Sequence, residues 1–287
     1  MNLAAATQRI TLAALLLSPA IYAAPQEDEN PREIGRTTER ELKITLSSTL
    51  GSIHISRGEP EKIAVITSGE KDGTKPHVTV DYAVRNRVGY LDITLGKDEG
   101  EHSGIHIRGG DWYITLTDAI PISFDLELDV GKGDFDLTGL KVKDFNLSAG
   151  ASDVTLTFDQ QNTTPVDNIN IESGVSKFDG RMLCNANFRH FRFQGGVGAS
   201  TLDFGGTLTR EVDVDLEVGL GVMNVIVPSQ VGARVFYSKN FLSKLQCDSD
   251  FEPSGQDQYT TTNFFGVPGR MNIRIDTGLG SIKVRRE

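Results

Sequence analysis

One short pattern recurs through the chain: apolar-x-apolar-x-x-Gly-x-(Gly or Ser)-x-apolar-x-apolar. The stretch SAGASDVTLTF (148–158) is one copy, and VGASTLDF (197–204) belongs to another. Alternation on both sides of a glycine predicts two β-strands, each with one buried face, joined at a bend where the glycine takes a positive φ. The first glycine of the pattern stands at Gly131, Gly150, Gly174, Gly198, Gly219 and Gly278, and a seventh copy near Gly51 has Thr49 in its place.

The five central copies follow one another at intervals of 19, 24, 24 and 21 residues. A repeat of this length is typical of a solenoid or stacked array. One copy buries about four side chains, worth roughly 6–12 kcal/mol, whereas ordering about twenty residues costs ~1–2 kcal/mol for each backbone unit. A single copy therefore cannot fold alone. We expect an all-β fold, a β-solenoid and more specifically a right-handed β-helix, built of stacked two-strand coils with glycine turns.

The glycine pairs in GVGAS and GLGVM also match the beginning of a dinucleotide-binding fingerprint. That fingerprint requires a following helix whose N-terminus faces the pyrophosphate. Here each pair leads into another alternating strand, and the pattern occurs seven times. The glycines are therefore interpreted as structural turns, and no cofactor or cofactor-binding residue is expected.

The first residues have the features of a secretory signal peptide. Residues 1–11 contain one basic residue and no acid, an apolar run covers 10–22, and Ala23 fits a cleavage site. A membrane anchor is the alternative, but the run is shorter than the ~20 residues of a spanning helix, and Pro19 interrupts it. We expect residues 1–23 to be a signal peptide and the mature protein to be exported, periplasmic or extracellular, with no membrane span after cleavage.

The rest of the chain divides by composition and by the regularity of the repeat. We expect a disordered polar segment at 24–40, N-terminal β-coils at 41–122, and regular solenoid repeats at 123–287 with an insertion at 228–271. Within the insertion, the polar stretch 243–263 is a candidate lid, cap or partner-facing loop.

Charge and cysteine content limit the function classes. The full chain has a net charge of −10, and loss of Arg9 with the signal peptide makes it −11. Such a surface repels nucleic acid and anionic lipid, so nucleic acid is excluded as a partner. Cys184 and Cys247 could form a disulfide in an oxidising compartment, or they could remain two buried or unpaired thiols.

A candidate binding face follows from the alternation. Four residues before the first glycine, the central copies carry outward polar side chains that would stack about 4.8 Å apart and form an amide ladder with an acid at each end. This surface would bind a cation or a sugar polymer, or it is a solvated face with an internal amide ladder. Its residues are Glu127, Asn146, Asn170, Gln194 and Asp215.

No pattern indicates catalysis or metal binding. DFDLTG (134–139) matches the start of a calcium loop, but Phe145 stands where the bidentate Glu belongs, and Phe135 and Leu137 are expected in the core. Trp112 alternates with apolar residues and is also expected in the core. We assign no catalytic residue and no metal ligand.

Three long stretches carry a resemblance to known families. WYITLTDAIPISFDLELDVGKGDFDLTGL, VDLEVGLGVMNVIVPSQVGARV and MNIRIDTGLGSIKVRRE resemble the toast-rack family, which is related to the C-terminal domains of LiaF-like cell-wall stress-response proteins. ITLSSTLGSIHISRGEPEKIAVIT resembles a family named "putative adhesin". The resemblance covers most of residues 42–286. It implies a non-enzymatic envelope protein, although the membrane spans through which LiaF-like proteins restrain a sensor kinase are missing here.

Two functional hypotheses from different classes follow. The first is an exported, non-catalytic scaffold, adhesin-like or linked to stress response, that binds an envelope protein or a cell-surface polymer. The alternative is a β-helix enzyme, a lyase or hydrolase, acting on polysaccharide. A purely structural module is a third hypothesis, and the sequence does not separate it from the first or determine the oligomeric state.

Overall fold

The computed structural model describes residues 31–69, 77–99, 105–107, 109–238 and 241–287. The expected signal peptide and residues 24–30 of the expected polar segment lie outside these ranges. Part of that polar segment is ordered, because strand β1 (Arg32–Gly35) pairs antiparallel with β3 (Lys62–Gly69). The expectation of disorder up to residue 40 is therefore wrong for β1, whose backbone hydrogen bonds are satisfied by β3.

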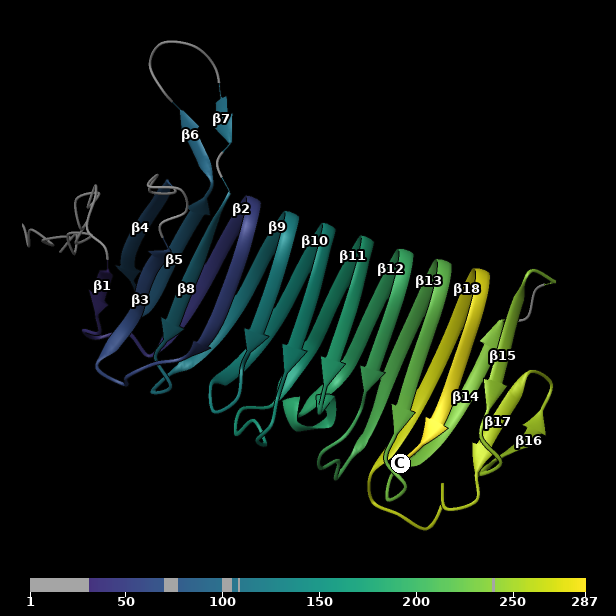
Figure 1. The fold of residues 1–287 in the computed structure, drawn as a ribbon. Coiled ribbons are helices and arrows are strands. Elements are labelled where there is room, and N and C mark those ends of the chain that lie inside the picture. Colours follow the sequence, from purple (N-terminus) through teal and green to yellow (C-terminus); the bar gives the residue numbers. More distant parts are fainter. Residues whose placement is uncertain (1–30, 70–76, 100–104, 108, 239–240) are drawn as a thin grey trace, which may run out of the picture.

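Seven long strands bend in the middle and stack in parallel, which gives the molecule the form of a rack (Figure 1). Each strand makes one coil with a first arm before the bend and a second arm after it. From the second of these coils to the sixth, short base loops join the second arm of one coil to the first arm of the next. The coils are β2 (Glu41–Arg57), β9 (Pro121–Asp136), β10 (Lys141–Thr157), β11 (Val166–Arg181), β12 (Phe188–Asp203), β13 (Glu211–Val227) and β18 (Arg270–Arg286). The all-β solenoid of two-strand coils is confirmed.

Each end of the stack is closed by a coil made of two separate strands. At the N-terminal end, β5 (Val88–Leu95) pairs with the first arm of β2 and β8 (Gly110–Leu116) with its second arm. Beyond them, β4 (Val78–Arg85) pairs with β5, and β3 pairs with β8. A short hairpin, β6 (Lys97–Glu99) and β7 (Ile105–Ile107), stands apart from the stack (Figure 1).

The C-terminal end repeats this arrangement with the insertion. Strand β14 (Gly232–Ser238) pairs with the first arm of β18, and β15 (Ser243–Cys247) pairs with its second arm. The hairpin of β16 (Phe251–Gly255) and β17 (Gln258–Thr261) then pairs with β14. The last strand in sequence, β18, consequently lies between β13 and the two-piece coil that precedes it in the chain.

The observed register corrects the alignment of two copies. Phe145 pairs with Phe124 rather than with Leu126, and Ser176 pairs with Gly198, which is therefore the second glycine of its copy and not the first. Sliding a strand by two residues leaves the same side chains facing inward, so alternation alone does not fix the register.

Positive φ occurs at the second glycine of the pattern in the observed register, which places Gly131, like Gly198, second in its copy. Gly221, for example, has φ 151°. Gly150 and Gly219, expected to need a positive φ, are not among the positive-φ residues. They are required for a different reason: a Cβ on Gly150 would lie 2.5 Å from the carbonyl oxygen of Asp129, and one on Gly219 would lie 2.7 Å from that of Gly196.

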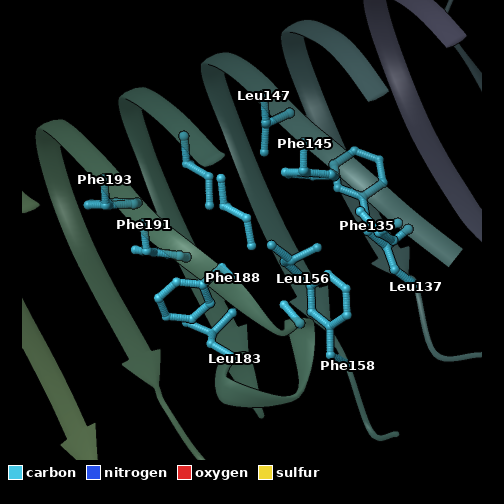
Figure 2. Packing of buried hydrophobic residues seen from close by; sticks show 14 of the residues in the cluster. Phe135, Leu137, Phe145, Leu147, Leu156, Phe158, Leu183, Phe188, Phe191 and Phe193 are labelled. Carbon is cyan, nitrogen blue, oxygen red and sulfur yellow. The ribbon is translucent and has the colours of Figure 1, made fainter. Parts of the chain in front are cut away.

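Aliphatic and aromatic side chains fill the space between the two arms. In Figure 2 the rings of Phe135, Phe145, Phe158 and Phe191 lie inside the stacked coils. Phe135, Leu137 and Trp112 are buried, as expected from the sequence. One continuous core runs along the stack, so the coils stabilise one another as a solenoid requires.

Buried asparagines join the base loops. The Nδ2 of Asn162 donates to the carbonyl oxygens of Val142 at 2.7 Å and Ala186 at 3.1 Å. Asn185, in the 3-10 helix η1 (Leu183–Ala186), donates to the carbonyl oxygen of Phe158 at 2.9 Å. These bonds satisfy backbone groups that would otherwise be buried without partners.

Both cysteines are free thiols, so the disulfide considered from the sequence is not formed. Cys184 is buried in η1, between β11 and β12. Cys247 pairs with Val284 at the far end of the stack. Coils β12 and β13 lie between the two sites, which places the cysteines too far apart to bond.

Candidate functional site

The outer surface of the first arms, here called the polar face, presents polar side chains in register. A central column runs through the middle of the arms, and a bend-side column lies two residues nearer the bend. The central column is Thr45, Asp125, Asn146, Asn170, Arg192, Asp215 and Arg274, and the bend-side column is Ser47, Glu127, Ser148, Glu172, Gln194, Glu217 and Asp276.

The structure distributes the five sequence candidates over both columns. Asn146, Asn170 and Asp215 lie in the central column, whereas Glu127 and Gln194 lie in the bend-side column. Part of the expected amide ladder is present, because Asn170 Nδ2 donates to Asn146 Oδ1 at 2.9 Å. Gln194 does not extend it; its Nε2 donates to Glu217 at 2.8 Å.

Opposite charges alternate toward the C-terminal end of the central column. Arg274 lies 3.2 Å from the Oδ1 of Asp215, with which it forms an exposed ion pair. Arg192, on the other side of Asp215, has no hydrogen bond or ion pair from its side chain to any described residue. Its guanidinium is therefore available to a ligand.

A C-terminal groove of about 510 Å³ lies over this part of the polar face. Its floor is formed by both columns of β12, β13 and β18, and it ends against Phe236 of β14. The turn between β16 and β17 forms a wall with Gln256 and Asp257. This turn is held in place because the backbone N–H of Tyr237 donates to the carbonyl oxygen of Asp257 at 3.0 Å.

An N-terminal groove of about 470 Å³ occupies the other end of the same face. Lys143 lines it and donates to Glu41 at 2.7 Å, and this hydrogen bond raises the pKa of Lys143 and keeps it charged. Lys43 lies 5.9 Å from the centre of the Tyr90 ring, within range of a cation–π contact. The polar face thus carries two grooves of mixed charge and aromatic character, and the Asn146–Asn170 ladder lines the N-terminal groove on the side that faces Arg192.

Sequence reasoning missed the residues that shape the C-terminal groove. Arg274 lies 59 residues after Asp215 in sequence, and the wall comes from the insertion. The stretch 243–263 was expected to be a lid, cap or loop, and it contains the β16–β17 cap. The repeat aligns Gly278 with Gly219 and so gives Arg274 the same position in its copy as Asp215, but only the stack shows that the two coils are neighbours.

Comparison with known families identifies the architecture. Residues 23–181 match the N-terminal domain of toast_rack, DUF2154. The chain belongs to the toast-rack family. This confirms the resemblance seen in the sequence, and the match spans the N-terminal end of the stack as far as coil β11.

Two solved structures resemble this toast-rack protein weakly. A "putative cell adhesion protein" from Clostridium sporogenes ATCC 15579 is 19% identical, with 92% of this chain and 100% of that chain covered and a TM-score of 0.42. A "putative adhesin" from Bacteroides fragilis NCTC 9343 is 14% identical, with 91% and 98% covered and a TM-score of 0.34. No curated protein matches the sequence.

Among the residues that the structure describes, no helix has the length and hydrophobicity to cross a membrane. Within the same residues, no group of three or more His, Cys, Asp or Glu side chains is arranged to hold a metal ion.

Proposed function

We propose that this toast-rack protein is an exported, non-catalytic scaffold whose polar face binds an envelope component, and that this component is a neutral, hydroxyl-rich polymer. The observation that carries the proposal is the in-register pair of polar columns with a groove at each end. Its length and regularity suit an extended ligand better than a compact one.

The chemistry of the columns fits hydroxyl groups. Carboxylates such as Glu172 and Asp276 accept hydrogen bonds, the guanidinium of Arg192 donates them, and the amide of Asn146 does both. A sugar hydroxyl can donate and accept, so it can pair with each of these groups. Because the side chains stand on a hydrogen-bonded strand ladder, little backbone ordering is needed when a polymer binds.

Net charge favours a neutral polymer over an acidic one. The chain has a net charge of −10, and the bend-side column has four acids, Glu127, Glu172, Glu217 and Asp276, with no base. A polyanion would meet repulsion along this column. The two arginines of the central column do not offset it, because Arg274 is already paired with Asp215.

A polymer also fits the face better than a protein partner does. The buried centre of a protein interface is usually depleted of charged residues. On the polar face the charged side chains are central, with Arg192 and Asp215 on the floor of the C-terminal groove. Aromatic side chains lie at the groove ends instead, Phe236 in one groove and Tyr90 in the other.

Co-sedimentation of the mature chain with neutral insoluble polysaccharide tests the proposal, and peptidoglycan sacculi, whose stem peptides carry carboxylates, serve as the acidic comparison. We expect Arg192→Ala/Asp276→Ala to lower the bound fraction at least several-fold. The matched control is Thr201→Ala/Asn224→Ala on the second arms of β12 and β13, which should bind like wild type. Equal binding by all three chains would reject the polar face as the site, and release of soluble sugar would reject a non-catalytic role.

A further inference from the structure

The bends of the coils line one edge of the rack (Figure 1), and the side chains at their tips form an uncharged aliphatic ridge. One residue from each of the seven coils stands at the tip of the bend, and the tips are in register. Six of the seven are large aliphatic side chains, with exposed fractions from 37% for Leu50 to 65% for Val175. The ridge consists of Leu50, Val130, Ala151, Val175, Val197, Leu220 and Leu279.

The ridge continues into the C-terminal end of the stack. Ser243 pairs with Gly280, so Leu242 follows Leu279 in the same row and is 51% exposed. Exposed glycines border the ridge on its first-arm side, where side chains would otherwise stand between the ridge and an approaching surface. These glycines are Gly150, Gly174, Gly196, Gly219 and Gly278.

A contiguous apolar row of this length on an acidic protein indicates an interaction surface. We propose that the ridge is the interface of a homodimer in which two copies lie side by side with their stacks parallel. The two-fold axis would run along the stack, so that each coil meets the same coil of the second copy.

The charges beside the ridge select this arrangement. With a two-fold axis along the stack, the first-arm side of each coil opposes the second-arm side of its equivalent. Glu172 of β11 then meets Lys177 of the second copy, and Glu127 of β9, which is in register with Glu172, meets Lys132. In the other coils the acids Glu217 and Asp276 oppose the neutral Val222 and Ser281, so no like charges meet.

An antiparallel pair would bring like charges together. A two-fold axis perpendicular to the stack and centred on β11 opposes first arm to first arm. Glu172 would then meet Glu172 of the second copy, and Glu127 of β9 would meet Glu217 of β13. Like charges opposed in this way suppress the arrangement.

The size of the ridge predicts a weak dimer. Eight rows at ~4.8 Å spacing and a width of four residues give roughly 450 Å² on each copy. This is below the ~800 Å² of a standard interface on each partner, so association is expected in the micromolar range or weaker. The parallel pair would leave the central columns of both polar faces free and pointing in opposite directions.

Sedimentation equilibrium up to millimolar concentration tests the association. We expect a reversible dimer, a rise of at least tenfold in the dissociation constant for Val175→Asp, and no change for Phe265→Asp, which alters an 82% exposed apolar side chain away from the ridge. Glu172→Lys should weaken the dimer, and Glu172→Lys/Lys177→Glu should restore it. A monomer at every concentration, or no effect of Val175→Asp in a folded chain, would overturn the proposal.

Cysteine crosslinking tests whether the stacks of the two copies run parallel or antiparallel in the dimer. In chains carrying Cys247→Ser, Val130→Cys and Leu220→Cys should each form a self-disulfide, because each faces itself in the parallel pair. Phe265→Cys should not. Crosslinking through Val175→Cys alone would overturn the parallel arrangement, since only the central coil faces itself in an antiparallel pair.

Discussion

Gly221 lies so close to Gly198 of the neighbouring coil that a Cβ on Gly221 would be 1.9 Å from the carbonyl oxygen of Gly198. The backbone of Gly221 also has φ 151°, a region that L side chains rarely adopt. The bends can stack at strand spacing only where such positions carry no side chain or where the coil bends differently, as it does at Ser176.

We therefore expect Gly221→Ala to lower the free energy of unfolding by more than ~2 kcal/mol, through backbone strain and displacement of the adjacent coil. Urea unfolding followed by circular dichroism measures this change. Gly35→Ala is the control, because a Cβ there meets no atom within 4 Å, and its effect should stay within ~0.5 kcal/mol. Equal stability of the two variants would contradict the account of the bends.

Two asparagines should differ in how much they stabilise the fold, because one lies in the buried base loops and the other on the exposed polar face. Asn162 is 4% exposed and donates two hydrogen bonds to backbone carbonyls, whereas Asn170 is exposed and donates one, to Asn146. We expect Asn162→Ala to cost about 2–3 kcal/mol, because the carbonyls of Val142 and Ala186 lose their buried donor. Asn170→Ala should cost less than ~1 kcal/mol, and the reverse order in urea melts would contradict these assignments.

Acid stability should depend on Glu39. Burial raises the pKa of Glu39, but hydrogen bonds from the backbone N–H and hydroxyl of Thr37, at 2.8 and 2.7 Å, outweigh burial and hold it below its ordinary value of 4.5. A lowered folded-state pKa gives stability that is complete above about pH 4.5 and is lost as the pH falls through the folded value.

Thermal melts of the wild type and of Glu39→Gln across pH 3–7 test this dependence. We expect the melting temperature of Glu39→Gln to fall less steeply below pH 4.5, since the substituted side chain does not titrate. Glu33→Gln, which changes a half-exposed carboxylate bound to Lys62, is the control. Parallel curves for Glu39→Gln and wild type would show that Glu39 contributes nothing to the acid transition.

The two thiols should be present and unreactive in the folded chain. Burial raises the pKa of Cys184 well above its ordinary value, and burial with the nearby charge of Asp248 raises the pKa of Cys247 to about 12. At neutral pH both are therefore protonated and poor nucleophiles. Ellman titration should detect slow reaction in the native protein and two thiols in denaturant, with no effect of reductant on the melting temperature; loss of these thiols in denaturant would indicate a disulfide.

The sequence was sufficient to predict the stacked coils because each copy carries its own alternation, and Phe135 and Leu137 alternate as buried residues must. It was not sufficient for the register, since a shift of two residues keeps Phe145 inside whether it pairs with Phe124 or Leu126. The C-terminal groove depends on a contact between strands that are distant in sequence, because β18 lies between β13 and β14. No local pattern encodes that placement, so the pairing of Arg274 with Asp215 was missed.

The central claim is that the polar face binds a neutral polymer, and carboxyl footprinting tests it most directly. The mature chain is labelled with a carbodiimide and an amine, with and without the polymer that it co-sediments with, and each carboxylate is quantified by mass spectrometry. We expect the polymer to protect Glu172 and Asp276 on the polar face and to leave Asp136 on a second arm unchanged. Unchanged labelling at Glu172 and Asp276 in the presence of bound polymer would contradict the account.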